Sequence, residues 1–116
     1  MHDSILTIHV LNQAEGIPGA GITVELWRMA PLEQVAVVMT DSDGKSPTPL
    51  LPPGTFVPGR YELRFRIGDY WAARGMAPDP AYFDVVAINV GFSTAGGHYH
   101  VPLGCTPWAY STYRGS

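Results

Sequence analysis

HYHVPLGCTPWAYSTYRGS, residues 98–116, is predicted to form two strands joined by a reversal, and the rest of the chain is organised around them. Side chains alternate between the two faces of an extended strand, which rises roughly 3.3 Å per residue. One face of residues 98–104 is apolar and suits a core: Tyr99, Val101 and Leu103. The other face carries two imidazoles that packing does not need: His98, His100, then Pro102 and Gly104. After Pro107 the chain can reverse and return over residues 110–114 as a second strand.

The remaining sequence consists of short segments of alternating polarity separated by turns. Alternation predicts strands over residues 5–11, 22–27, 35–40, 60–67 and 86–92. Between them lie a turn-forming stretch at 12–19, an Asp-Gly turn at 41–45 and a proline-rich loop at 46–59. A short helix is expected at 69–74, closed by Gly75. Seven or eight strands with at most one helix predict an all-β, antiparallel β-sandwich, formed by residues 1–116 as a single domain.

Composition narrows the classes of partner. Apolar residues make up 46% of the chain, which is enough to build a hydrophobic core. Charged residues make up only 15%, which indicates that more surface is buried than a small monomer can bury alone. The formal net charge is −3 without a basic run, so no nucleic-acid partner is expected. There is no apolar run near the roughly 20 residues of a membrane helix, and no signal-peptide pattern, so no membrane partner is expected. A single cysteine forms no internal disulfide. We expect a soluble, cytoplasmic protein.

Histidines on polar strand faces are the candidate functional groups. His9 lies in the middle of the outer face of the first predicted strand, and His98 and His100 lie on that of a later one. An imidazole with a pKa of roughly 6.5 can take up and release protons near neutral pH. Lys45 follows the Asp-Gly turn, at the mouth of the sheet. Three imidazoles would also allow an open zinc site.

The whole chain resembles a known family. Its terminal STYRGS (111–116), HYHVPL (98–103) and LTIHVL (6–11) are similar to motifs of the 5-hydroxyisourate hydrolases, the transthyretin-like proteins of purine breakdown. The TDSDG turn (40–44) and GRY (59–61) agree with the same pattern. This resemblance implies a transthyretin-like sandwich of two four-stranded sheets with a short helix after the fifth strand. It also implies a homotetramer, a dimer of dimers, with active sites in the channel between the dimers.

The implied reaction is hydrolytic opening of a cyclic amide in 5-hydroxyisourate, a purine-derived small molecule, without metal or cofactor. The resemblance implies catalytic roles for four residues: His9, Lys45, His100 and Ser116. It implies substrate contacts for the terminal motif and the strand before it: Arg114, Tyr113, Gly104 and His98. Either His9 or His100 would be the general base, while Lys45 and Arg114 would hold anionic oxygens of the ring.

Several positions depart from the family pattern. Lys45 stands where the family has an arginine, which exchanges a planar fork of donors for a compact ammonium. Asn12 stands where the family has an aspartate, and Asp84 stands where it has a proline. Gly104-Cys105-Thr106 stands where the family has Leu-Leu-Ser. Because Gly104 shares a face with both histidines of its strand, we expect a leucine-sized gap beside the site.

Three alternatives stay open. The gap at Gly104 would admit an N-methylated 5-hydroxyisourate, as arises from methylxanthine breakdown. A non-catalytic ligand carrier like transthyretin is a second alternative, although a carrier needs neither the histidines nor the Tyr-Arg-Gly-Ser tail. A zinc hydrolase is the third, although no carboxylate or thiolate accompanies the histidines. Cys105 is expected to be a small buried apolar residue rather than a nucleophile.

Overall fold

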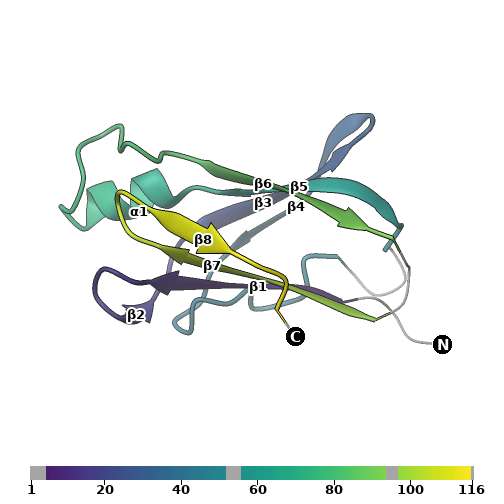
Figure 1. Ribbon diagram of the computed structural model, residues 1–116, viewed down its shortest axis with the longest axis horizontal. Coiled ribbons are helices and arrows are strands. Elements are labelled where there is room, and N and C mark those ends of the chain that lie inside the picture. The colour runs from purple at the N-terminus through teal and green to yellow at the C-terminus, as the bar shows by residue number, and fades with distance from the viewer. Residues whose placement is uncertain (1–4, 52–55, 94–96, 116) are drawn as a thin grey trace.

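A computed structural model describes residues 5–51, 56–93 and 97–115. In this part of the chain it contains eight strands and one short helix (Figure 1). In chain order these are β1 (Ile5–Asn12), β2 (Ile17–Pro18), β3 (Thr23–Met29), β4 (Leu32–Met39), β5 (Gly59–Phe65), α1 (Ile67–Ala73), β6 (Val86–Phe92), β7 (His98–Cys105) and β8 (Tyr110–Thr112).

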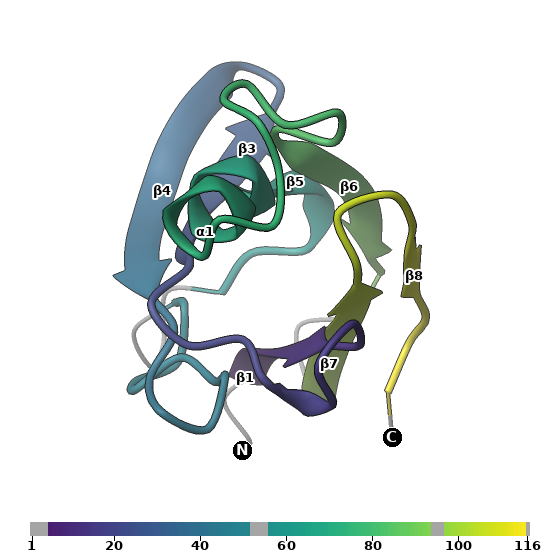
Figure 2. The same ribbon diagram turned by 90° about the vertical axis from the view of Figure 1, so that its left-hand side faces the viewer.

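The strands form two four-stranded sheets that face each other as a sandwich (Figure 2). The strand orders are β2-β1-β7-β8 and β4-β3-β5-β6. The predicted two-sheet sandwich with one helix is therefore confirmed. The prediction that every pairing is antiparallel was wrong for one pair, because β1 and β7 run parallel. A short turn imposes antiparallel pairing only on the strands that it joins, and β1 and β7 are separated by the whole opposite sheet.

The alternation expected for β1 and β7 is confirmed. The inner side chains are the even-numbered ones in β1 and the odd-numbered ones in β7. Each is less than 10% exposed: Leu6, Ile8 and Val10 in β1, and Tyr99, Val101 and Leu103 in β7. They pack against buried side chains of the opposite sheet, among them Leu26, Leu63 and Phe65. Trp71 of α1 is fully buried in the same core. This packing leaves the odd residues of β1 and the even residues of β7 on the outer face.

Two local features differ from the sequence expectations. β2 lies within the stretch expected to form only turns, and it pairs with the end of β1 through Leu11↔Pro18 and Asn12↔Ile17. The helix begins at Ile67, two residues before its expected start, so that Ile67 and Trp71 share one buried face. Gly75 ends it as expected, with a φ of 69° that an L side chain rarely adopts.

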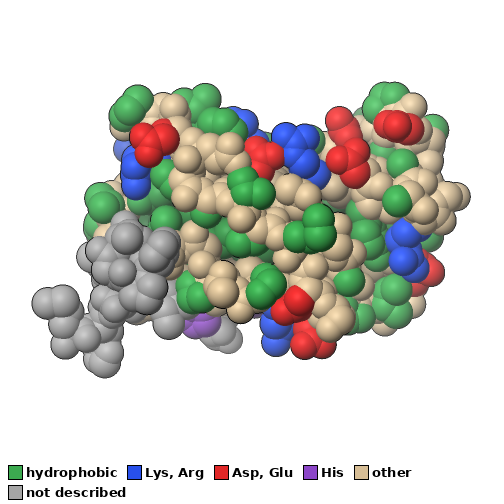
Figure 3. Space-filling view, turned by 180° about the vertical axis from the view of Figure 1, so that it is seen from behind, with side chains coloured by type: hydrophobic (Ala, Val, Ile, Leu, Met, Phe, Trp, Pro, Cys, Tyr) green, Lys and Arg blue, Asp and Glu red, His purple; other side chains and the backbone are tan. Residues whose placement is uncertain are grey.

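The surface away from β8 is chemically mixed. Seen from behind, acidic and basic side chains are interspersed with exposed apolar ones (Figure 3). Two of the ion pairs lie at the sheet β4-β3-β5-β6: Arg64–Glu62 within β5 at 2.6 Å, and Arg66, the residue after β5, with Glu25 of β3 at 2.5 Å. Among the described residues, no helix combines the length and the apolar character needed to span a membrane.

Asn12, at the end of β1, is a fully buried polar residue. Its Nδ2 donates to Glu15 Oε1 and to Tyr70 Oη, both at 3.0 Å, while its Oδ1 accepts from the backbone N–H of Glu15 at 3.0 Å. Arg74 also pairs with Glu15 at the surface. Asn12 thus ties the β1–β2 turn to α1, so this departure from the family pattern concerns the fold rather than the polar outer face.

The Asn12→Asp variant tests this arrangement. It replaces the Nδ2 donor with a carboxylate oxygen facing Glu15 Oε1, and we expect the free energy of unfolding at neutral pH to fall by about 1–3 kcal/mol. Acidification protonates the new carboxyl and restores an O–H donor, so the loss should shrink as the pH falls. Urea unfolding at neutral and mildly acidic pH measures both effects. Adding Glu15→Gln should recover part of the loss, and a single variant as stable as wild type would contradict the account.

Candidate functional site

The pairing of β1 with β7 assembles three histidines on the outer face of one sheet. In the parallel register Thr7 lies opposite His100 and His9 lies opposite Pro102. His9 and His100 are half-buried and His98 is exposed. The ring centroids of His98 and His100 are 6.0 Å apart. The structure therefore brings together the histidines that the sequence placed on polar faces.

A turn carries Lys45 to the same place. Asp41 Oδ1 accepts from the backbone N–H groups of Asp43 at 2.9 Å and Lys45 at 3.1 Å. The carbonyl of Gly44 then accepts from Val10 N–H at 2.8 Å, which attaches the turn to β1. Gly44 has a φ of 76°, and a Cβ there would collide with the Val10 carbonyl oxygen. Glycine is thus required at this position, and the result is a backbone bridge between His9 and Lys45.

Lys45, His98 and His100 line a hollow of about 280 Å³, which we call the Lys45 hollow, whereas His9 is outside its lining. Its lining residues are Thr7, Ile8, Lys45, Ser46, His98 and His100. Within the described residues, no acidic side chain forms an ion pair with Lys45. Its ammonium is therefore available to an electron-rich ligand. Neither Thr7 nor Ser46 was among the predicted site residues. The alternation that placed His9 on the outer face could have indicated Thr7.

His100 is held in a defined position, and its surroundings lower the pKa of its imidazole. Its Nδ1 lies 2.8 Å from Thr7 Oγ1, and the same hydroxyl lies 2.8 Å from His98 Nε2. Burial lowers the pKa of His100 below the ordinary value for histidine, and the nearby His98, His9 and Lys45 lower it further by charge repulsion. The imidazole is thus neutral at neutral pH and can act as a base.

The chain end is fastened against His100. Gly115 N–H donates to the His100 carbonyl at 2.8 Å, and the two residues form a bridge outside the named strands. A Cβ on Gly115 would come within 2.5 Å of His100 Cδ2, so only glycine lets the tail lie against the ring. Ser116 follows directly but lies outside the described residues, so its predicted catalytic role stays a prediction.

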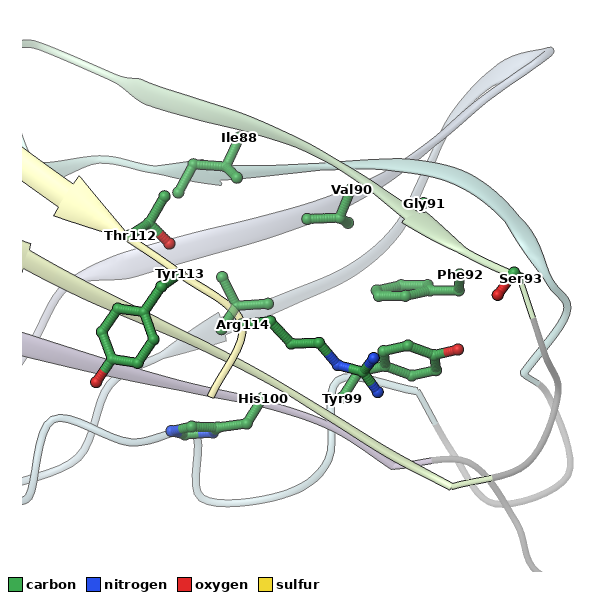
Figure 4. A pocket seen from close by; sticks show the side chains of 11 residues that line it. Ile88, Val90, Gly91, Phe92, Ser93, Tyr99, His100, Thr112, Tyr113 and Arg114 are labelled. Carbon is green, nitrogen blue, oxygen red and sulfur yellow. The ribbon is translucent and has the colours of Figure 1, made fainter. Parts of the chain in front are cut away.

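Arg114 and Tyr113 lie elsewhere on the tail. The guanidinium of Arg114 lies over the Tyr99 ring, 4.7 Å from its centroid. It lines a second cavity of about 300 Å³ between β6 and the tail, which we call the edge cavity and which shares His100 with the Lys45 hollow. Figure 4 shows the His100 imidazole turned away from Arg114 and Tyr99. Tyr113 is 70% exposed. The substrate contacts predicted for both residues stay predictions, and the Lys45 hollow does not include them.

The gap expected at Gly104 is not empty. Gly104 lies opposite Leu11 on β1 and Ser111 on β8, and a Cβ there would collide with the side-chain carboxamide of Gln13. Gln13 thus occupies the space that a leucine would fill, and it weakens the argument for an N-methylated substrate. Cys105 is fully buried, and burial raises the pKa of its thiol to about 11, so it is not a nucleophile at neutral pH.

The possibility of a zinc site finds no support in the side-chain arrangement. Over residues 5–51, 56–93 and 97–115, no three His, Cys, Asp or Glu side chains are grouped so that they could hold a metal ion. The site as described offers imidazoles, one ammonium and hydroxyls. These groups can transfer protons and stabilise negative charge.

Comparisons with known proteins agree with this chemistry. The family model described as HIUase/Transthyretin family matches residues 6–115. A 5-hydroxyisourate hydrolase of Pseudomonas aeruginosa is 48% identical over 114 residues, which cover 96% of this chain and 90% of the relative. The structure of Klebsiella pneumoniae 5-hydroxyisourate hydrolase is 31% identical, with a TM-score of 0.82 over 97% of this chain and 99% of that chain.

Two further structures are similar. A crystal structure of (S)-allantoin synthase is 35% identical with a TM-score of 0.92; the match covers 99% of this chain but 44% of that longer chain. Sea bream transthyretin in complex with thyroxine has a TM-score of 0.84 at 23% identity, over 95% of this chain and 93% of that chain. At this identity the likeness to transthyretin shows the fold alone.

A Lys45→Gln variant tests the electrostatics of the Lys45 hollow. Loss of the ammonium removes one of the positive charges that repel a proton from His100, so the pKa of His100 should rise. Lys45→Arg keeps the charge and serves as the control, with the pKa of His100 remaining low. Histidine proton chemical shifts, followed by NMR against pH, measure both. An unchanged pKa in Lys45→Gln would mean that Lys45 does not act on His100.

Proposed function

This chain belongs to the HIUase/Transthyretin family, and we propose that the Lys45 hollow and its histidines perform the chemistry of the hydrolases in that family. The function of the chain is hydrolysis of 5-hydroxyisourate in urate degradation. One observation carries the assignment of the residues. His9, Lys45 and His100 come from three separate segments, yet strand pairing and the Gly44 turn bring them to one face of the sheet.

Ring opening of a cyclic amide needs a nucleophilic water, a cation near the carbonyl oxygen and a proton for the leaving nitrogen. We assign the base to His100, because its lowered pKa keeps it neutral at neutral pH. Its imidazole takes a proton from water as the water oxygen bonds to the carbonyl carbon. The carbon–nitrogen bond then breaks, and the nitrogen leaves with a proton returned by an imidazolium.

We assign the roles of Lys45 and His9 from where each residue lies. The Lys45 ammonium is placed to hold the carbonyl oxygen as it gains negative charge, as an oxyanion hole does. His9, bridged to Lys45 through the backbone, is placed to orient the substrate or to donate the proton to the nitrogen. Ser116, through its hydroxyl, is proposed to position the substrate or the water. The cytoplasm stays the proposed compartment.

Alanine substitution of each histidine tests the assignment. We expect His100→Ala and His9→Ala each to lower the enzymatic rate by about 10²- to 10⁴-fold, the usual contribution of a general acid or base. The measurement is the decay of 5-hydroxyisourate absorbance, corrected for spontaneous opening, with thermal unfolding to confirm that each variant is folded. In wild type, kcat/KM should fall with acidification through a pKa below that of ordinary histidine. Wild type and His9→Ala that both open the ring no faster than it opens spontaneously would favour a carrier instead.

We also propose that the chain forms a homotetramer, a dimer of dimers. In support of this proposal, each sheet has one of its two edge strands, β6 or β8, on the same side of the sandwich (Figure 2). Edge strands present unpaired backbone groups to a second chain. Exposed aromatic rings lie at β8 and beyond it, with Tyr110 42% and Tyr113 70% exposed.

Light scattering coupled to size-exclusion chromatography tests the assembly. The expected mass is four times that of one chain, and a charged substitution on the exposed face of β8, such as Tyr110→Glu, should shift it downward. The matched control is Leu32→Glu, an exposed apolar residue of β4 at the edge of its sheet opposite β6, which should leave the mass unchanged. A wild-type monomer with full activity would contradict the proposal.

A further inference from the structure

The hydroxyl of Thr7 links two histidines of the site. Thr7 Oγ1 lies 2.8 Å from His100 Nδ1 and 2.8 Å from His98 Nε2. The strand register explains this arrangement, because Thr7 on β1 lies directly opposite His100 on β7, and His98 precedes His100 on the same face. Neither Thr7 nor this link belongs to the roles that the family resemblance implies.

A hydroxyl carries one hydrogen, so it donates to at most one of the two rings. If Thr7 donates to His100 Nδ1, the proton of neutral His100 must sit on Nε2. If Thr7 instead donates to His98 Nε2, its oxygen accepts from His100 Nδ1–H, and Nε2 of neutral His100 carries a lone pair. The direction of one O–H bond therefore decides which nitrogen of His100 can act as a base.

The geometry of the ring decides which lone pair is needed. Thr7 lies against Nδ1, Gly115 packs against the opposite edge of the ring at Cδ2 and Cγ, and Nε2 is not bonded to Nδ1, so Nε2 is the nitrogen left free of the Thr7 contact. Nδ1 is occupied by Thr7 and cannot reach a water in the hollow. The base proposed above must therefore use Nε2.

We propose that Thr7 is a positioning residue whose hydroxyl accepts from His100 Nδ1–H and donates to His98 Nε2, so that Nε2 of His100 is left unprotonated as the base. The inference rests on the proposed function of His100. It also gives His98 a definite task, which is to accept the Thr7 hydrogen and keep it away from His100. When His100 takes a proton at Nε2, the Nδ1–H bond to Thr7 is retained and holds the ring in place.

Thr7→Val is the test variant, because valine keeps the β-branched shape that suits a strand and removes only the hydroxyl. We expect kcat to fall by about 10- to 100-fold, the usual effect of removing a partner that orients a reacting imidazole. KM should change little, since the size of the side chain is preserved. Thr7→Ser is the matched control, because it keeps the hydroxyl and loses a methyl group, and it should retain most of the wild-type kcat.

Nitrogen-15 NMR of the histidine rings provides a readout that does not depend on catalysis. In wild type above the pKa of His100, we expect the shift of a protonated Nδ1 and an unprotonated Nε2 for His100. Thr7→Val should move His100 toward the Nε2–H tautomer, and Thr7→Ser should not.

Three results would overturn the inference: an Nε2–H tautomer in wild type, an unchanged tautomer and kcat in Thr7→Val, or an equal loss of kcat in Thr7→Ser. Failure of the proposed function would be distinct, because it would appear as a wild-type protein that does not open 5-hydroxyisourate whatever its tautomer.

Discussion

The parallel pairing of β1 with β7 is the constraint on which the site depends. Its register places Thr7 beside His100 and His9 beside Pro102, while the inner side chains of both strands are buried in the core. A shift of this register by one residue would turn the histidines of one strand into the core and expose its apolar side chains. The hydrophobic core therefore holds the polar outer face in position, and its residue Ile8 also lines the Lys45 hollow.

Two glycines complete the site, because they have no side chain and let their backbone lie close against neighbouring atoms. Gly44 brings Lys45 against β1, and Gly115 brings the tail against the His100 ring. A Cβ would collide with the Val10 carbonyl oxygen at position 44 and with the His100 ring at position 115. The result is a compact arrangement in which partial burial, and then nearby positive charge, lower the pKa of His100 and keep it neutral at neutral pH. The same features that position the groups thus also adjust their chemistry.

Much of this could be predicted from the sequence, and the limits have physical causes. Alternation along single strands is a local property, so the faces of His9, His98 and His100 could be predicted. The parallel pairing and the Thr7 link depend on which strands meet, a long-range outcome that strand polarity does not specify. The direction of Arg114 depends on how the tail leaves β8, and the gap at Gly104 is filled by Gln13 from another turn. A substitution seen in isolation does not reveal such compensation.

The most direct test of the account is a crystal structure with a bound, non-hydrolysable analogue of the urate ring, compared with its N-methylated form. The account predicts the analogue in the Lys45 hollow, with a ring oxygen within hydrogen-bonding distance of Lys45 Nζ and a ring carbonyl within reach of a water bound to His100 Nε2. The unmethylated ring should be favoured, because Gln13 occupies the space beside Gly104. An analogue that inhibits the enzyme while bound against Arg114 in the edge cavity, with the Lys45 hollow empty, would contradict it.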